Sequence, residues 1–419
     1  MNVIYEKAAL ALASALGLAT AWTIIPRLRP SWWLLAARWD TLVLWLATRL
    51  APIWFIYVFS HYSPHSDVAT CFWPQAQGAL AGQIPYRDFE SFFSPLFPSL
   101  LAIPLLAWPD PRVIFIWMSV LEAITIAATA RAAGFDQPGV RRARFMACAF
   151  LAPGPLLLCV IGGQEDFLVW SFGLFTWLAA TRHRDYRAGF RAAAGMLITK
   201  PLFILPLAGF LGLVRSRRAY LGVLVPVGVA SAALLWHLTG RAFLMTLGQS
   251  HNISPPNLWI ILHFLSAGRI PAGGPILSFS ALAILLVGAL FLGVRHAETL
   301  RASFADFAAG WTLLFALLML LSPKSEGAYL ANFALPCLAW LIDRPKWILL
   351  WTGLGAVGVV ESSLFYRLGE ICPADWAEVA GPAMAVDLVL QLLEVTALVA
   401  IAALAWRALS SPAVPHHAR

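Results

Sequence analysis

The sequence predicts an all-α protein that crosses a membrane many times. Hydrophobic residues make up 60% of its 419 residues and charged residues only 12%, and the mean hydropathy is +0.76. A soluble domain carries about 25% charged residues, roughly twice as much. Apolar runs near the ~20 residues needed for one crossing recur along the chain, and arginines gather in the short segments between them. We therefore expect a single integral membrane domain over residues 1–419.

The apolar runs predict about thirteen transmembrane helices. The first ends before Pro26 and Arg27, and the second follows a segment that contains Arg38. The predicted spans are 3–25, 42–60, 113–131, 143–161, 167–181, 187–199, 201–214, 219–238, 276–294, 303–321, 327–342, 347–366 and 384–407. The run 95–108 is left out because it has fourteen residues and several prolines, so a short interfacial helix is expected there. The basic clusters then share one side, which the positive-inside rule assigns to the cytoplasm.

Composition also limits the partners and cofactors. The net charge of +8 could suggest a nucleic-acid partner, but the arginines lie in short clusters between apolar runs, so none is expected. The five cysteines form no CxxC pair, so zinc binding and thiol redox chemistry are not indicated. No His and Asp residues have metal-ligand spacing, and no obligatory metal is expected. A divalent cation could still assist Asp67 or Asp88.

The side opposite the arginines collects acids and long polar segments. The loop 61–112 contains Asp67, Asp88 and Glu90, and Pro74 and Gly82 mark the first turn and the end of a short helix within it. The stretch 239–275 contains His251 and a short apolar run, so it is predicted to be re-entrant or interfacial.

Sharp breaks interrupt the apolar runs on this same side. They lie at 162–166 (GGQED), at Lys200-Pro201 and at 321–330 (LSPKSEGAYL). Proline cannot continue a helix without loss of a hydrogen bond. Irregular backbone at membrane depth persists only where protein or water satisfies its polar groups. The sequence therefore predicts a polar cavity that the breaks share.

These motifs, taken in order, resemble those of the GT-C-fold glycosyltransferases. The resemblance is closest to the bacterial polyprenol-phosphate-mannose-dependent mannosyltransferases, and it covers about residues 60–340. Its elements are Asp67, Trp73-Pro74, Gly82, Pro85-Tyr86-Arg87-Asp88-Phe89, Ser94-Pro95, Gly163-Gln164, Lys200-Pro201 and Ser322-Pro323. The chain departs from the pattern at Ser94, where many relatives have a second proline, and at 327–329, where many have a histidine.

The resemblance implies a GT-C-like bundle in the inner membrane of a bacterium, with its active site facing the periplasm. It further implies transfer of a mannose-like hexose from a polyprenyl-phosphate donor to a glycan or lipid acceptor, with inversion of configuration. Asp67 would be the general base that accepts the proton of the acceptor hydroxyl. The leaving phosphate needs fixed cations. The other candidates for substrate binding are Tyr86, Arg87, Asp88, Gln164, Glu165, Asp166, Lys200, His251, Lys324, Glu326 and Tyr329.

Each candidate also has a structural interpretation. Asp67 could cap a loop helix, Asp88 could pair with Arg87, and Lys200 could extend its side chain to the membrane surface. Glu122 and Glu394 lie deep within predicted spans, where carboxylates are costly and are either functional or bonded between helices. For the whole chain, the alternative is a transporter or flippase of lipid-linked sugars. That function favours paired broken helices in an internal repeat, and none is evident.

Overall fold

The computed structural model describes residues 2–27, 39–62 and 66–410. Regular structure in this part of the chain is helical, and the only β-type pairings in it are two isolated bridges, Pro85 with Phe89 and Ser254 with Lys324. The described helices are α1 (Asn2–Ile24), η1 (Ile25–Arg27), η2 (Leu46–Leu50), α3 (Ala51–Ile53), η3 (Trp54–Phe59), η4 (Val68–Phe72), α4 (Trp73–Leu80), α5 (Phe97–Leu105), α6 (Arg112–Ala132), α7 (Val140–Leu151), α8 (Pro153–Leu157), η5 (Leu158–Gly162), α9 (Phe167–Thr181), α10 (Asp185–Ile198), η6 (Pro201–Phe203), α11 (Ile204–Leu213), α12 (Arg217–Thr239), η7 (Ala242–His251), α13 (Leu258–Leu265), α14 (Pro275–Arg295), α15 (Ala297–Ala302), α16 (Phe304–Leu321), η8 (Gly327–Asn332), α17 (Ala334–Leu341), α18 (Pro345–Arg367) and α19 (Pro382–Ser410).

Eight helical segments in the described part of the chain are long and apolar enough to cross a membrane. They are Lys7–Arg27, Trp39–Phe59, Arg112–Ala132, Arg217–Thr239, Pro275–Arg295, Phe304–Leu321, Pro345–Arg367 and Pro382–Ser410. A ninth span results if Val140–Leu151 and Pro153–Gly162, which meet at 45°, are counted together. The prediction of an all-α, multi-pass membrane protein is confirmed at this level, whereas thirteen spans and a GT-C bundle are not.

Five predicted spans are not among the eight: one, 143–161, is the bent pair, and the other four correspond to short helices. α9 has 15 residues, α10 has 14, α11 has 10 and α17 has 8. At 1.5 Å per residue the longest of them is about 22 Å, which is less than the ~30 Å of a hydrocarbon core. The corresponding predicted spans, 167–181, 187–199, 201–214 and 327–342, have 13 to 16 residues, which is already below the ~20 residues of one crossing.

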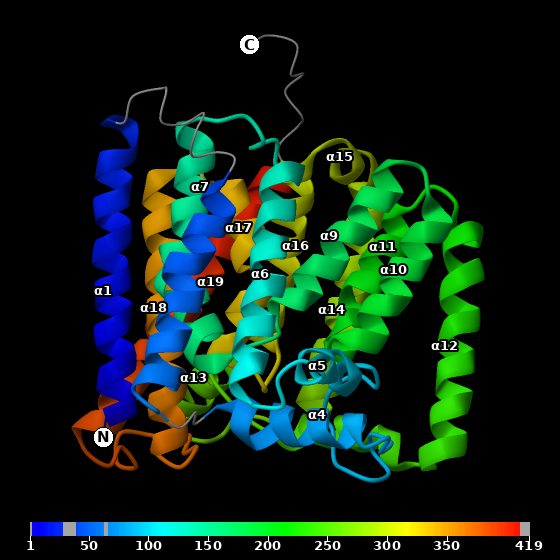
Figure 1. Cartoon of the computed structure of the whole chain (residues 1–419). Coiled ribbons are helices and arrows are strands. Elements are labelled where there is room, and N and C mark those ends of the chain that lie inside the picture. Colours follow the sequence, from blue (N-terminus) through cyan, green and yellow to red (C-terminus); the bar gives the residue numbers. More distant parts are fainter. Residues whose placement is uncertain (1, 28–38, 63–65, 411–419) are drawn as a thin grey trace.

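The predicted loop 61–112 contains the expected short helices. α4 has Pro74 in its first turn, and the chain leaves it through Gly82, whose φ of +74° favours glycine. The run 95–108 forms the nine-residue α5, which is too short to span. Figure 1 shows α4 and α5 at the same end of the bundle as α13, below the lower ends of α9–α11.

An aromatic cluster within the core joins α9 to α16. The rings of Trp170 and Trp311 have centroids 5.2 Å apart, and those of Trp177 and Phe307 are also 5.2 Å apart. Gly173 on α9 makes this possible, because a Cβ there would lie 2.1 Å from the Trp311 ring. The indole Nε1 of Trp311 donates to the carbonyl oxygen of Asn332 (2.9 Å), so the core also fixes the position of η8.

A fully buried ion pair ties the segment Trp39–Phe59 to α6 and α7. The Arg49 guanidinium bonds both oxygens of Glu122, at 2.7 and 3.2 Å, and its Nη1 donates to the Phe150 carbonyl at 2.7 Å. Arg49 has no exposed surface. Glu122, which the sequence places deep in a predicted span, therefore bonds one helix to another.

Replacing Arg49 with methionine should lower the free energy of unfolding by about 3–5 kcal/mol, because it leaves the Glu122 carboxylate buried without a partner. Thermal unfolding in detergent measures this loss. The double variant R49M/E122L removes the remaining charge and should recover most of the stability. A double variant as unstable as R49M would show that packing, not the unpaired charge, accounts for the loss.

Candidate functional site

The three predicted chain breaks meet at one polar cluster. Lys200, between α10 and η6, places its Nζ 2.7 Å from Glu165 Oε1 and 2.9 Å from Asp166 Oδ1 in the turn before α9. Asp166 Oδ1 also accepts a hydrogen bond from Asn332 Nδ2 of η8 (3.2 Å). Hydrogen bonds, ion pairs, ring contacts or electrostatic interactions connect the residues of this polar cluster, which are Asp67, Gln164, Glu165, Asp166, Lys200, Lys324, Glu326, Tyr329 and Asn332.

Glycine and proline at the breaks explain why the chain turns there. Gly163 has a φ of +61°, and a Cβ at this position would lie 2.5 Å from a methyl carbon of Val68. Only glycine therefore allows the turn to approach the loop so closely. Pro201 ends the α10 hydrogen-bond ladder, and Lys200 before it is extended, with φ −121° and ψ 152°.

Lys200 is enclosed by two carboxylates and two aromatic rings. Its Nζ lies 5.1 Å from the ring centroid of Tyr329 and 5.8 Å from that of Phe93, which are cation–π distances. Its side chain is 17% exposed, while those of Glu165 and Asp166 are 2% and 0% exposed. Two acids therefore compensate one buried lysine.

Burial and charge have opposite effects on the pKa values in this group. Burial by itself lowers the pKa of Lys200, but Asp166 and Glu165 outweigh it and hold that pKa well above its usual value. Burial raises the pKa of Glu165 to about 7 against the opposing effect of Lys200. Burial also raises the pKa of Asp166, again against Lys200. Glu165 therefore changes its charge near neutral pH.

Asp67 is an exposed carboxylate that one amide orients. Gln164 Nε2 donates to Asp67 Oδ2 at 2.9 Å. Asp67 precedes η4, yet its side chain makes no capping hydrogen bond there, so the helix-cap interpretation does not describe its contacts. It interacts electrostatically with Lys7 of α1, Glu165 and Tyr366 of α18.

The second loop, 239–275, supports the turn that carries Lys324 and Glu326. Ser254 forms a bridge with Lys324, and Asn257 Nδ2 donates to the Pro323 carbonyl at 2.8 Å. Lys324 Nζ lies 3.6 Å from Glu326 Oε1, and both side chains are about a quarter exposed. Glu326 also interacts electrostatically with Asp166. The side chain of His251 lies outside the described part of the structure.

Tyr86, Arg87 and Asp88 make their bonds within their own loop. Arg87 Nε and Nη2 pair with Asp88 at 2.9 and 3.0 Å, and the Ile84 amide donates to Asp88 Oδ2 at 2.8 Å. Hydrogen bonds from Arg87 and Ile84 lower the pKa of Asp88. The Tyr86 hydroxyl donates to the Phe93 carbonyl. These contacts match the structural interpretation of Asp88 and fix the shape of the loop.

The later part of the loop also reaches the polar cluster. The amide of Ser94 donates to the Thr199 carbonyl (3.3 Å) and that of Leu96 donates to the Leu197 carbonyl (2.9 Å), at the end of α10. These bonds bring the Phe93 ring to Lys200. The Ser94-Pro95 step is thus a second point at which the loop joins the breaks, besides the bond from Gln164 to Asp67.

Sequence reasoning missed one polar residue of the cluster and two beside it. They are Lys7, whose Nζ donates to Ser363 Oγ at 2.7 Å, Asn332 and Tyr366. Each lies on an apolar helix, and polar groups in such positions are costly unless they are bonded or functional. That cost is the one sequence signal that could have identified them.

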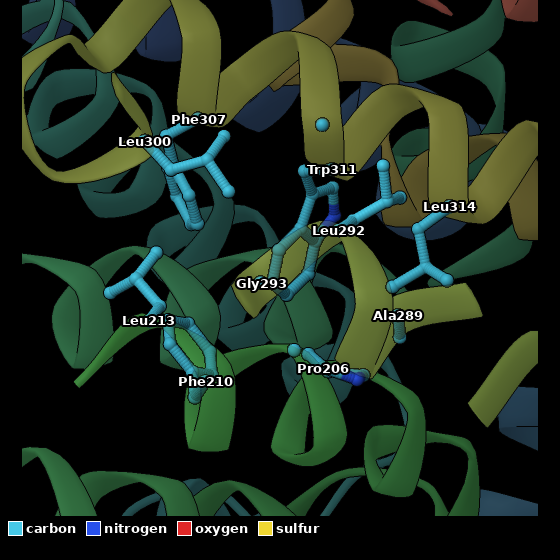
Figure 2. A pocket seen from close by; sticks show the side chains of 12 residues that line it. Pro206, Phe210, Leu213, Ala289, Leu292, Gly293, Leu300, Phe307, Trp311 and Leu314 are labelled. Atoms are coloured by element: carbon cyan, nitrogen blue, oxygen red, sulfur yellow. The ribbon is translucent and has the colours of Figure 1, made fainter. Parts of the chain in front are cut away.

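A separate cavity of about 50 Å³ lies among α11, α14 and α16. Figure 2 shows its lining, which is apolar and includes Phe210, Leu292, Phe307, Trp311 and Leu314. It contains no group suited to acid–base chemistry. Its relation to the polar cluster is indirect, through the hydrogen bond from Trp311 to Asn332.

Comparisons with known protein families, with curated proteins and with solved structures find no match. Among the residues with described positions, no three His, Cys, Asp or Glu side chains are grouped so that they could hold a metal ion.

The pKa of Glu165 predicts a pH effect on stability. An unfolded glutamate titrates near 4.5 and the folded one near 7, so the folded state keeps a proton that the unfolded state loses between these values. Stability should fall as pH rises through this window, by on the order of 3 kcal/mol at most. E165Q cannot titrate and should gain in melting temperature relative to the wild type between about pH 5 and pH 8. The exposed E90Q is the control, and an E165Q difference that does not change with pH would contradict the assignment.

Proposed function

We propose that this chain is a membrane glycosyltransferase. It would move a mannose-like hexose from a polyprenyl-phosphate donor to a glycan or lipid acceptor on the extracytoplasmic face of a bacterial inner membrane. The observation that carries the proposal is the exposed Asp67 carboxylate, which Gln164 orients next to the enclosed group of Lys200, Glu165 and Asp166. An oriented base beside charged and aromatic side chains suits transfer of a sugar.

The proposed reaction is a single displacement. The hydroxyl oxygen of the acceptor forms a bond to the anomeric carbon while the bond from that carbon to the phosphate oxygen breaks, and the electron pair leaves with the polyprenyl phosphate. Asp67 accepts the hydroxyl proton. Gln164 bonds Oδ2, which leaves Oδ1 for the acceptor. Attack opposite the leaving group inverts the configuration, as in inverting carbohydrate enzymes.

The lysines have different roles in this proposal. Lys200 already neutralises Glu165 and Asp166, so we assign it to holding these acids in place and to tuning their charge. Lys324, which is 26% exposed at the turn before η8, and Lys7 near Asp67 are better placed to meet the leaving phosphate. A divalent cation could accompany that phosphate.

The acids and aromatic rings would hold the sugar. The carboxylates of Glu165, Asp166 and Glu326 can accept hydrogen bonds from sugar hydroxyls, and the rings of Phe93 and Tyr329 offer stacking faces. Arg87 and Asp88 would lie at the rim of the site on the loop that carries Asp67. Membrane lipid would surround the polyprenyl chain of the donor, and α4 and α5 lie at this end of the bundle (Figure 1).

One observation favours the alternative, a transporter or flippase of lipid-linked sugars. A hollow of about 1100 Å³ opens among the ends of α11, α12, α14 and α15, and its lining includes Arg215, Arg217, Arg218, Glu298 and Arg301. Figure 1 places α15 at the end of the bundle opposite to α4. A transporter needs a polar opening at each end of the bundle. The test must therefore separate sugar transfer from transport across the membrane.

The test is consumption of the donor by purified protein. Wild-type protein should cleave a polyprenyl-phosphate mannose in the presence of acceptor glycans or lipids, and D67N should be slower by at least ~10², because the substitution removes the general base. The variant E90Q changes an exposed acid of the same loop and should keep the wild-type rate.

Two results would contradict the proposal. A D67N variant with the wild-type rate would remove Asp67 from the chemistry. A wild-type protein that leaves every polyprenyl-phosphate sugar intact, but moves lipid-linked sugars across proteoliposomes, would be a transporter.

A further inference from the structure

A second group of acids lies inside the bundle, between α18 and α19. Asp387, Gln391 and Glu394 follow each other at intervals of four and three residues, so they share one face of α19. Glu361 comes from α18 and interacts electrostatically with Asp387 and Glu394. All four side chains are buried, with at most 3% exposure. We call these four residues the inner acid group.

Most oxygen atoms of the inner acid group have no hydrogen-bond partner. Both carboxylate oxygens of Glu361 and of Glu394 are unpartnered, as are Asp387 Oδ1 and Gln391 Oε1. The one bond within the group runs from Gln391 Nε2 to Asp387 Oδ2, at 2.7 Å. Gln391 therefore points into the group and leaves its own acceptor oxygen open there.

No cation compensates these acids in the described part of the chain, where every ion pair involves other carboxylates. From the loop between α18 and α19, Cys372 interacts electrostatically with Asp387 and Glu361, and it carries no positive charge. From α1, Lys7 bonds Ser363 on α18. In α16, which packs on α19, the one charged residue is Asp306, in its first turn.

The group adjoins η8, which carries two residues of the polar cluster. A Cβ on Gly358 of α18 would lie 3.1 Å from Glu394 Oε1, and one on Gly327 of η8 would lie 2.2 Å from the Gly358 carbonyl oxygen. The two glycines let α18 and η8 touch, and the acids lie just behind this contact. Tyr329 and Asn332 follow Gly327 within one or two turns.

Three ionised carboxylates cannot persist together in this position. An unpaired charge inside a membrane costs several kcal/mol, and neighbouring like charges add to that cost. A positive charge must therefore occupy the group. A metal ion would need several ligands grouped around one point, and no three such side chains are so grouped among the described residues. A proton needs one acceptor atom only.

We propose that the inner acid group is a proton-binding site within the membrane. At neutral pH, Glu361 and Glu394 are neutral carboxylic acids. Gln391 donates to Asp387 and offers its Oε1 to a carboxyl O–H. The site holds protons against the wall formed by Gly358 and Gly327, behind the polar cluster. This inference does not depend on the proposed glycosyl transfer.

Infrared spectroscopy of the full-length protein in detergent tests this directly, because a protonated carboxylic acid has a carbonyl band that an ionised carboxylate lacks. At pH 7 the difference spectrum between wild type and E361Q/E394Q should contain this acid band. The matched control E298Q removes an exposed acid at the arginine-rich end and should give no acid band. A difference spectrum without the band for E361Q/E394Q would overturn the proposal.

Two further measurements address folding and metal ions. Glutamine has the shape of a protonated glutamate, so E361Q/E394Q should keep the wild-type melting temperature; if the double variant fails to fold, each single variant should lose part of the acid band. Addition of Na⁺ or Mg²⁺ should leave the wild-type band unchanged. Loss of the band on addition of either ion would show that a metal cation displaces the protons, and would overturn the assignment of the group to protons alone.

Discussion

The contact on which the candidate site depends is the one between Lys200 and the acids Glu165 and Asp166. Its three side chains come from two chain breaks, and Asn332 joins the third break to them through Asp166. Because a charge buried alone in a membrane is so costly, none of these groups could take its position without the others. The breaks are held together by the charges that they carry.

The same constraint is met in three ways along the bundle. The guanidinium of Arg49 pairs with Glu122 and adjacent carbonyls, which makes a structural bond. Lys200 has two acids and two aromatic rings around it. One of these acids, Glu165, changes its charge near neutral pH. The carboxylate oxygens of Glu361 and Glu394 have no hydrogen-bond partner. We propose that protons neutralise their charge. A fully paired charge, such as Arg49 with Glu122, makes the bundle rigid. A carboxyl group that can gain or lose a proton, such as Glu165, is suited to proton transfer.

Much of the site could be predicted because its signals are local. Gly163, Lys200-Pro201 and Ser322-Pro323 interrupt apolar runs, and such interruptions must meet other polar groups. Asp88 shows the limit of this reasoning, since its neighbour Arg87 binds both of its oxygens. Lys7, Asn332 and Tyr366 show the converse, because their partners are remote in the sequence and their only local signal is a polar residue in an apolar helix.

The sequence by itself determined the all-α membrane class, the short helices of the first loop and the positions of the breaks. These follow from composition, apolar run length and the backbone limits of glycine and proline, which are properties of neighbouring residues. Only the tertiary structure decided that Lys200 lies between Glu165 and Asp166, and that Glu361 interacts electrostatically with Glu394. These depend on burial and on partners supplied by distant segments, and packing alone brings such segments together.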